Sequence, residues 1–303
     1  MGEAMLELSA DGPTWRMGYG GDTLNTAVHL SRLGISTAYF TALGHDAFAP
    51  DLKTAWLHEG LCLDLVQIDP ERTTGLYAIK TDPLGERTFT YWRSASAARR
   101  MLELPTSEAA LHRAAQARVL YLSLITLGIL PSESHERLWS LCRSIRSQGG
   151  RVIFDGNYRP TLWRTRADAL VARRQALALC DLALPTLDDE MATSASGDIQ
   201  SLLTEMQDLG VGQIALKMGE KGCIDGHGVS YPPARAIQPI DTSGAGDAFN
   251  AGFIAAWIRH LPFAVCAQAG NELAGWVIKR AGAIPQPDPE APYRAIQLLL
   301  QAR

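Results

Sequence analysis

The sequence predicts an α/β protein built on a doubly wound, mostly parallel sheet that is sandwiched by helices. Short apolar segments alternate along the chain with longer segments of helical periodicity, which is typical of right-handed βαβ crossovers. The apolar segments are hydrophobic almost without interruption, and this indicates strands buried on both faces. In such sheets ligands bind beyond the carboxyl ends of the strands, so the loops there are expected to hold the functional residues.

One region departs from that alternation. Residues 76–80 and 87–93 flank a turn at 82–86 and predict a β-hairpin. We expect the region 74–94 and short segments around residues 5–20 to form a small β lid on a single domain spanning residues 1–303. The remaining strands are expected at residues 37–43, 119–126, 152–155, 182–185 and 214–218, and the helices at 47–59, 132–148, 170–178, 199–209, 247–260, 263–280 and 293–301.

The composition is that of an ordinary globular enzyme. Of 303 residues, 47% are hydrophobic and 20% are charged, which is enough for a substantial core. The formal net charge of −4 gives no general attraction for nucleic acid or for anionic membranes, and arginine pairs such as Arg99–Arg100 are expected on solvated surfaces. No apolar run approaches the ~20 residues of a membrane helix and no signal peptide is apparent, so a cytoplasmic location is expected. Five widely spaced cysteines favour free thiols over disulfides or a zinc site.

Residues 241–253 form the most informative segment. Glycines and small residues precede an apolar, helix-forming run, and Asp247 stands where that run begins. Unpaired amides at the start of such a helix carry partial positive charge and bind phosphate groups. A carboxylate beside them is typical of the base in a phosphoryl transfer. A glycine-rich turn with an acidic N-terminal cap would produce the same pattern without chemistry.

A second glycine-containing segment lies near the N-terminus. Gly20 and Gly21 precede Asp22 and Asn25 in an expected helix that ends near Gly34. Paired glycines permit close approach of a ligand, and the two polar side chains present an acceptor and a donor toward sugar hydroxyls. A tight turn followed by a helix cap explains the same residues equally well.

The predicted hairpin carries aromatic and cationic residues. Tyr91 and Arg93 are two positions apart, so in a regular strand they point to one side, and Tyr77 can share that face. A phenol and a guanidinium together suit a ligand with hydroxyls and a carboxylate, because arginine grips a carboxylate with two hydrogen bonds. A solvated face with aromatic cross-strand packing is the alternative.

Three further groups follow expected strands. Arg159, after residues 152–155, is a second candidate anion contact or else a surface loop residue. Asp189 and Glu190 either hold Mg²⁺, directly or through water, or form an ordinary acidic first turn of a helix. Lys217 stands at a strand end before two turn glycines, which suits a nucleotide but is also common in plain turns.

Taken together, these residues resemble the ribokinase/PfkB family of carbohydrate kinases along nearly the whole chain. The resemblance implies a ribokinase-like fold, with ATP and Mg²⁺ as cofactors. It implies that Asp247 is the catalytic base and that Gly244, Ala245 and Gly246 form an anion hole. The family's other motifs match Gly20, Gly21, Asp22 and Asn25 on the sugar side, and Lys217, Gly219, Gly222, Ser243, Gly244, Gly246 and Asn271 on the nucleotide side.

Within the family, the chain is similar to the kinases that convert 2-keto-3-deoxygluconate to its 6-phosphate. In those kinases hairpin aromatics and two arginines embrace an acid sugar, which fits Tyr77, Tyr91, Arg93 and Arg159. A neutral hexose would leave both arginines without an anion. A fructokinase or another neutral-sugar kinase is the alternative. Because family members commonly pair through the lid, a homodimer or higher homo-oligomer is expected.

Two features depart from the family pattern. Family members usually begin with an apolar strand before the glycine–glutamate pair that is Gly2–Glu3 here. Absence of that strand would expose the ladder groups of its neighbours, so a truncated, non-catalytic sugar-acid-binding protein is a further alternative. The family's Asn-x-x-Glu magnesium motif has Thr186 at its first position and either Asp189 or Glu190 at its last.

Overall fold

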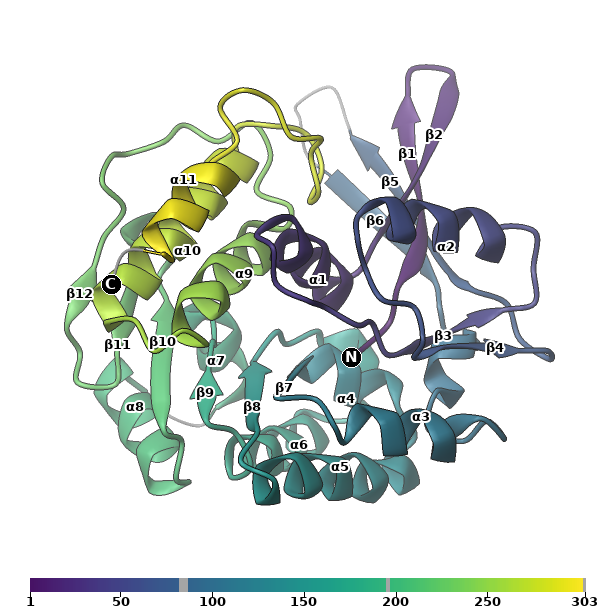
Figure 1. Ribbon diagram of the computed structural model, residues 1–303, viewed down its shortest axis with the longest axis horizontal. Coiled ribbons are helices and arrows are strands. Elements are labelled where there is room, and N and C mark those ends of the chain that lie inside the picture. The colour runs from purple at the N-terminus through teal and green to yellow at the C-terminus, as the bar shows by residue number, and fades with distance from the viewer. Residues whose placement is uncertain (82–86, 195–196, 302–303) are drawn as a thin grey trace.

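A six-stranded sheet forms the centre of the computed structural model, which describes residues 1–81, 87–194 and 197–301 (Figure 1). The strand order is β12-β11-β10-β9-β8-β7. Strands β7 to β10 are parallel, and β11 and β12 extend the sheet in antiparallel fashion. The strands are β7 (Val119–Ser123), β8 (Arg151–Asp155), β9 (Leu182–Ala183), β10 (Gln213–Lys217), β11 (Cys223–Asp225) and β12 (Ser230–Tyr231).

Helices cover both faces of this sheet, as the doubly wound prediction requires. In β8, Val152 and Phe154 enter one apolar cluster, whereas Ile153 between them enters the other. Side chains alternate along a strand, so such a strand must be apolar at every position. The first cluster includes α3 (Ser107–Ala114), α4 (Leu124–Ile129), α5 (His135–Ser147), α6 (Arg166–Leu177) and α8 (Ile199–Asp208); the second includes α1 (Asp22–Arg32), α9 (Ala245–Trp257), α10 (Phe263–Val277) and α11 (Tyr293–Leu299).

A four-stranded sheet projects from this body in the order β2-β1-β5-β6 (Figure 1). We call it the lid sheet. The antiparallel pairing of β5 with β6 confirms the predicted hairpin strands, while the expected turn at 82–86 lies outside the described residues. Its strands are β1 (Met5–Asp11), β2 (Thr14–Gly20), β5 (Gly75–Thr81) and β6 (Arg87–Trp92), and α2 (Ala49–His58) packs Trp56 against Tyr19 of β2.

The first residues of the chain run between the central sheet and a separate parallel pair, β3 (Thr41–Gly44) and β4 (Val66–Asp69). The Gly2 amide donates to the Phe40 carbonyl at 3.1 Å, and the Met1 ammonium donates to the Tyr121 carbonyl at 2.8 Å. Phe40 precedes β3 and Tyr121 belongs to β7. These first residues therefore supply hydrogen-bond donors to some of the backbone carbonyls that were expected to lack a partner.

Several predicted boundaries were wrong for local reasons. The strand expected at 119–126 stops at Ser123, whose side chain forms a capping box with Thr126 and begins α4. Helix α6 begins before residue 170 because Thr165 caps it. The five cysteines are free, as expected; four of them are buried, whereas Cys62 is exposed. None of the helices in the described ranges combines the length and apolar character that crossing a bilayer requires.

A buried histidine links α1 to α11 and to the segment that follows α10. His29 Nε2 lies 3.1 Å from the Ala283 carbonyl, so Nε2 carries the proton, and Nδ1 accepts from the Tyr293 hydroxyl at 2.8 Å. Tyr293 in turn accepts from Arg32 at 3.2 Å. Burial lowers the pKa of His29 to about 3, and the charge of Arg32 adds to this effect against the carbonyl hydrogen bond.

This histidine should make folding stability sensitive to acid. The folded-state pKa lies below the unfolded value of 6.5, so the contribution of the neutral ring is present above that pH and is lost as pH falls toward 3. We expect the unfolding free energy of the wild type to fall about 2 kcal/mol more between pH 7 and 5 than that of His29→Gln. Urea unfolding at both pH values measures this difference; an equal fall in both proteins would contradict the assignment.

Candidate active site

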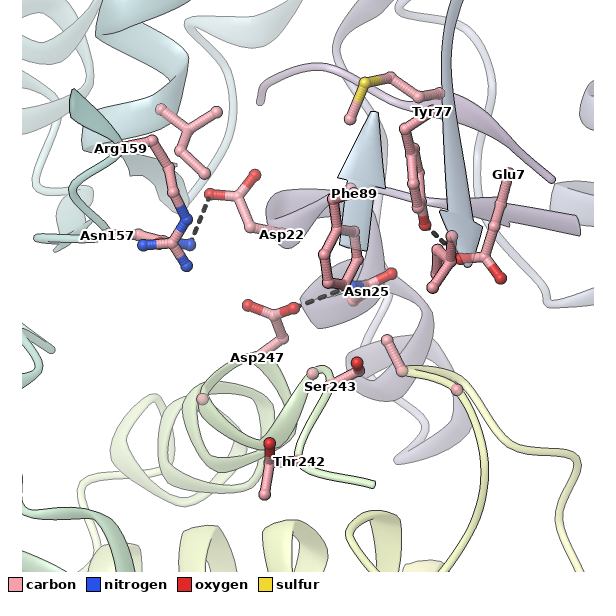
Figure 2. Close-up of a pocket in the computed structure, with 18 of the residues that line it drawn as sticks. Glu7, Asp22, Asn25, Tyr77, Phe89, Asn157, Arg159, Thr242, Ser243 and Asp247 are labelled. Carbon is pink, nitrogen blue, oxygen red and sulfur yellow. Dashed lines mark hydrogen bonds between the residues drawn. The ribbon is translucent and has the colours of Figure 1, made fainter. Parts of the chain in front are cut away.

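A cavity of about 1410 Å³ lies between the lid sheet and the carboxyl ends of the parallel strands (Figure 2). Its wall also includes the start of α1, the loops that follow β8 and β9, and the segments 239–247 and 281–283. The position agrees with the general rule for open α/β sheets. Most of the predicted site residues line it: Gly21, Asp22, Asn25, Tyr77, Tyr91, Arg93, Arg159, Asp189, Lys217, Ser243, Gly244, Ala245, Gly246 and Asp247.

The start of α9 is shaped by Gly244. This residue has φ of 70°, in the left-handed region, and a Cβ added to it would lie 2.7 Å from the Ala283 Cα atom. Glycine is therefore the residue that fits here. Helix α9 begins directly afterwards at Ala245, two residues earlier than predicted, so Asp247 lies in its first turn. The early amides of a helix have no intrahelical acceptor and favour an anion. The Ala245 amide donates to the Thr242 carbonyl at 3.2 Å, which leaves the amides of Gly244 and Gly246 as the candidates for the predicted anion hole.

Asp247 is buried and faces the cavity from the first helical turn (Figure 2). Asn25 Nδ2 donates to its Oδ2 at 2.8 Å. The pKa of Asp247 is raised to about 8, mainly by burial and then by the neighbouring carboxylates of Asp22 and Asp155, against the opposing effects of Asn25 and Lys217. A carboxyl group whose pKa lies near neutral pH exchanges protons readily, which suits a general base.

A charged network lies beneath this residue. Lys217 Nζ contacts Asp155 Oδ1 at 3.1 Å and Asn250 Oδ1 at 3.0 Å, and Asn250 Nδ2 donates to Asp155 Oδ2 at 2.9 Å. Lys217 therefore lines the cavity, but its ammonium group already contacts two protein side chains. The sequence had suggested a lysine whose ammonium group would contact the nucleotide. Sequence reasoning missed the roles of Asp155 and Asn250. The signal for Asp155 was present, because it is the last residue of a buried strand.

The lid sheet contributes an aromatic wall. The Tyr77 hydroxyl donates to Glu7, and Gly20 permits this approach because a Cβ there would lie 2.2 Å from that hydroxyl. Gly20 thus acts through Tyr77 and does not itself line the cavity. Tyr91 packs against Tyr77 and stacks on Phe89, with ring centroids 5.8 Å and 6.3 Å apart. Phe89 was not among the predicted residues, although it lies two positions before Tyr91 on the same strand face.

Both predicted arginines reach the cavity, and both have protein partners. Arg93 Nε donates to Glu3 Oε2 at 2.7 Å and forms an ion pair with that carboxylate, which is buried. Arg159 Nη1 donates to the Tyr158 carbonyl at 2.6 Å and contacts Asp189 at 3.3 Å. Neither partner was foreseen, because Glu3 and Arg93 are 90 residues apart in sequence.

The structure places the two acids proposed for a metal in different surroundings. Asp189 lines the cavity, and burial raises its pKa against the opposing charge of Arg159. Glu190 lies outside the cavity wall and pairs with the fully buried Arg173 at 2.6 Å, so its carboxylate is taken by a structural ion pair. Within the described ranges no group of three or more metal-binding side chains occurs.

Of the residues predicted on the nucleotide side, some line the cavity and others do not. Ser243 and Gly246 line the cavity beside Gly244. Asn271 donates instead to the Tyr231 carbonyl at 3.1 Å, and a Cβ at Gly222 would meet the same carbonyl. Gly222 and Asn271, together with Gly219, lie outside the cavity wall.

Comparison with known proteins agrees with this geometry. Residues 3–291 match the model of the pfkB family carbohydrate kinases. The chain belongs to that family. A 2-dehydro-3-deoxygluconokinase of Escherichia coli K12 is 40% identical over 294 residues, covering 94% of this chain and 95% of the relative. A fructokinase of Klebsiella pneumoniae is 31% identical over 266 residues and covers 86% and 84%.

The fold also matches solved structures of the family. Aminoimidazole riboside kinase from Salmonella enterica, solved with aminoimidazole riboside and an ATP analogue, superposes with a TM-score of 0.80. It is 21% identical and covers 99% of this chain and 98% of that one. This likeness confirms the predicted ribokinase-like α/β fold.

The raised pKa of Asp247 predicts how turnover depends on pH. The base must be deprotonated to act, so kcat/KM should rise with pH and level off above about 8. Asp247→Asn should lower kcat by 10²–10⁴-fold. Asp22→Asn removes a nearby negative charge and should move the acidic limb to lower pH. The pH profile of ADP release measures both effects; a limb that stays in place in Asp22→Asn would contradict the electrostatic coupling.

Proposed function

We propose that the protein phosphorylates 2-keto-3-deoxygluconate with ATP, giving the 6-phosphate. The single observation that carries the proposal is the buried Asp247 carboxylate at the amide-rich start of α9, facing a cavity that several arginines enter. The identity of 40% to a 2-dehydro-3-deoxygluconokinase supports the acid sugar over a neutral one.

In the proposed reaction the terminal hydroxyl of the sugar attacks the γ-phosphorus of ATP. A new bond forms between the sugar oxygen and phosphorus, and the bond from phosphorus to the bridging oxygen of ADP breaks. Asp247 accepts the hydroxyl proton as the attack proceeds. The amides of Gly244 and Gly246 stabilise the charge on the transferring group, while the Ala245 amide donates to the Thr242 carbonyl. The lid sheet excludes water above the site.

The residues present fit a magnesium ion that is held mainly by phosphate and water oxygens. Mg²⁺ usually binds proteins through one or two carboxylates and keeps several waters. Asp189 is the carboxylate that we assign to it, through water, because Glu190 is engaged by Arg173. When bound with ATP, the ion neutralises charge on the phosphate oxygens.

The sugar lies, in this proposal, between α1 and the aromatic wall of the lid sheet. Asn25 Oδ1 is buried, lines the cavity region and has no hydrogen-bond partner in the described part of the chain. It is placed to accept from a sugar hydroxyl. Asp22 offers a second acceptor, and Tyr77 and Tyr91 offer ring faces. Arg93 and Arg159 supply positive charge for the carboxylate.

A substrate panel tests the proposal. We expect magnesium-dependent ADP release with 2-keto-3-deoxygluconate or its galacto epimer that greatly exceeds release with fructose or ribose. Arg93→Ala and Arg159→Ala should weaken the acid sugars about 10- to 100-fold, because a hydrogen bond to a charged group contributes about 1.5–3 kcal/mol. Turnover of neutral sugars alone would replace the proposed substrate by that of a fructokinase. Absence of turnover on every sugar would favour a non-catalytic binding protein.

We also propose that two copies of the chain pair through the outer face of the lid sheet. Trp15, Met17 and Trp92 lie on the face opposite the cavity-lining residues, and each is more than half exposed. Exposed apolar patches of this kind are typical of protein interfaces. Light scattering should find a dimer for the wild type and a monomer for a Trp15→Glu/Met17→Glu variant. Leu298→Glu, an exposed apolar residue on α11, is the control and should remain dimeric.

A further inference from the structure

A third arginine enters the cavity beside the two that were predicted. Arg99 lies on a short 3-10 helix, Ala97–Arg100, that follows β6, and its side chain lines the cavity with Arg93 and Ser94. The sequence places it in an arginine pair of the kind expected on solvated surfaces. The structure instead places it half-buried against the substrate space.

The charges around Arg99 do not balance. Arg99 interacts electrostatically with Glu3, Arg93 and Arg72, so these four residues carry three positive charges and one negative charge. Both oxygens of Glu3 are engaged, one by Arg93 and the other by the Ser96 hydroxyl. Burial lowers the pKa of Arg99. The charge of Glu3 opposes this effect, and the positive charges of Arg93 and Arg72 add to it. The cluster therefore has excess positive charge that an anion would neutralise.

Arg99 also differs from its neighbours in its contacts. Arg93 is held by Glu3 and Arg159 by Asp189 and a carbonyl. The adjacent Arg100 pairs with Glu71 at 2.5 Å. The Arg99 guanidinium makes no hydrogen bond or ion pair with any residue that the structure describes. Among these arginines it is the one with no donor engaged by a described residue, whereas Arg159 is engaged through Nη1.

We propose that Arg99 binds the carboxylate of the sugar acid, and that Glu3 acts as a positioning residue that holds Arg93 beside it. The inference rests on the proposed function and deepens it by naming a residue that selects acid over neutral sugars. A guanidinium presents donors in a planar fork that matches the two oxygens of a carboxylate. A neutral sugar would leave this positive charge uncompensated in a partly desolvated wall, so the same residue disfavours it.

The test compares two substrates that differ at one group. 3-Deoxyfructose has a hydroxymethyl group where 2-keto-3-deoxygluconate has its carboxylate. Arg99→Gln should raise KM for the acid about 10- to 100-fold with little change in kcat, and should not raise KM for the neutral sugar, which no longer faces an uncompensated positive charge. Arg99→Lys keeps the charge but loses the fork, so an intermediate KM is expected. Arg100→Gln is the matched control, because Arg100 lies outside the cavity wall, and it should behave as the wild type.

The outcomes separate the two proposals. If the wild type phosphorylates the acid but Arg99→Gln leaves its KM unchanged, or weakens both sugars equally, the role of Arg99 is overturned while the function stands. A wild type that phosphorylates only the neutral sugar overturns the proposed function and the role of Arg99 with it. Calorimetric dissociation constants for both sugars give the same comparison if the neutral sugar turns over too slowly. If Arg99→Gln does not fold, Arg99→Lys must still weaken the acid selectively, and an unchanged affinity there overturns the role.

Discussion

The buried ion pair between Lys217 and Asp155 connects the central sheet to the helix that carries Asp247. It joins the ends of β10 and β8, and Asn250 completes it from the second turn of α9. Because the helix carrying Asp247 is fastened to the sheet by these contacts, the position of its first turn depends on them. Both charged groups are almost fully buried, and removing one partner of such a pair typically costs about 3–5 kcal/mol. The pair is thus a requirement of the site's geometry as well as of the fold.

The same network sets the basicity of Asp247. Burial and the negative charges of Asp22 and Asp155 raise its pKa, while Asn25 and Lys217 lower it. Had Lys217 no carboxylate partner, its charge would act on Asp247 more strongly and produce a weaker base. Asp155 therefore has two effects that point the same way: it neutralises the lysine, and it adds a negative charge near the base. The ion pair that joins α9 to the sheet therefore also helps to set the raised pKa of Asp247.

The sequence predicted those parts of the site that depend on local pattern. The start of α9 was recognisable because glycines and an acid before an apolar helix form a contiguous signal. The lid hairpin was recognisable from the alternation of Tyr91 and Arg93 along one strand. Contacts between distant segments were not predictable in this way: Glu3 with Arg93, and Arg173 with Glu190, join residues that only the tertiary fold brings together. Helix α4 was missed because its six residues are too few to show a helical period and continue an apolar strand.

The cavity combines groups of opposite charge that suit the two ends of one substrate. Asp22 and Asp247 place carboxyl groups in the region between α1 and α9, whereas Arg93 and Arg99 bring positive charge from the segment after β6. A six-carbon 2-keto acid has its carboxylate at carbon 1 and its reacting hydroxyl at carbon 6. Attraction of the carboxylate to the arginines would favour the orientation that presents the hydroxyl to Asp247. Two ion pairs that are complete without substrate, Lys217–Asp155 and Arg93–Glu3, maintain this separation, so little reorganisation is needed when the acid binds.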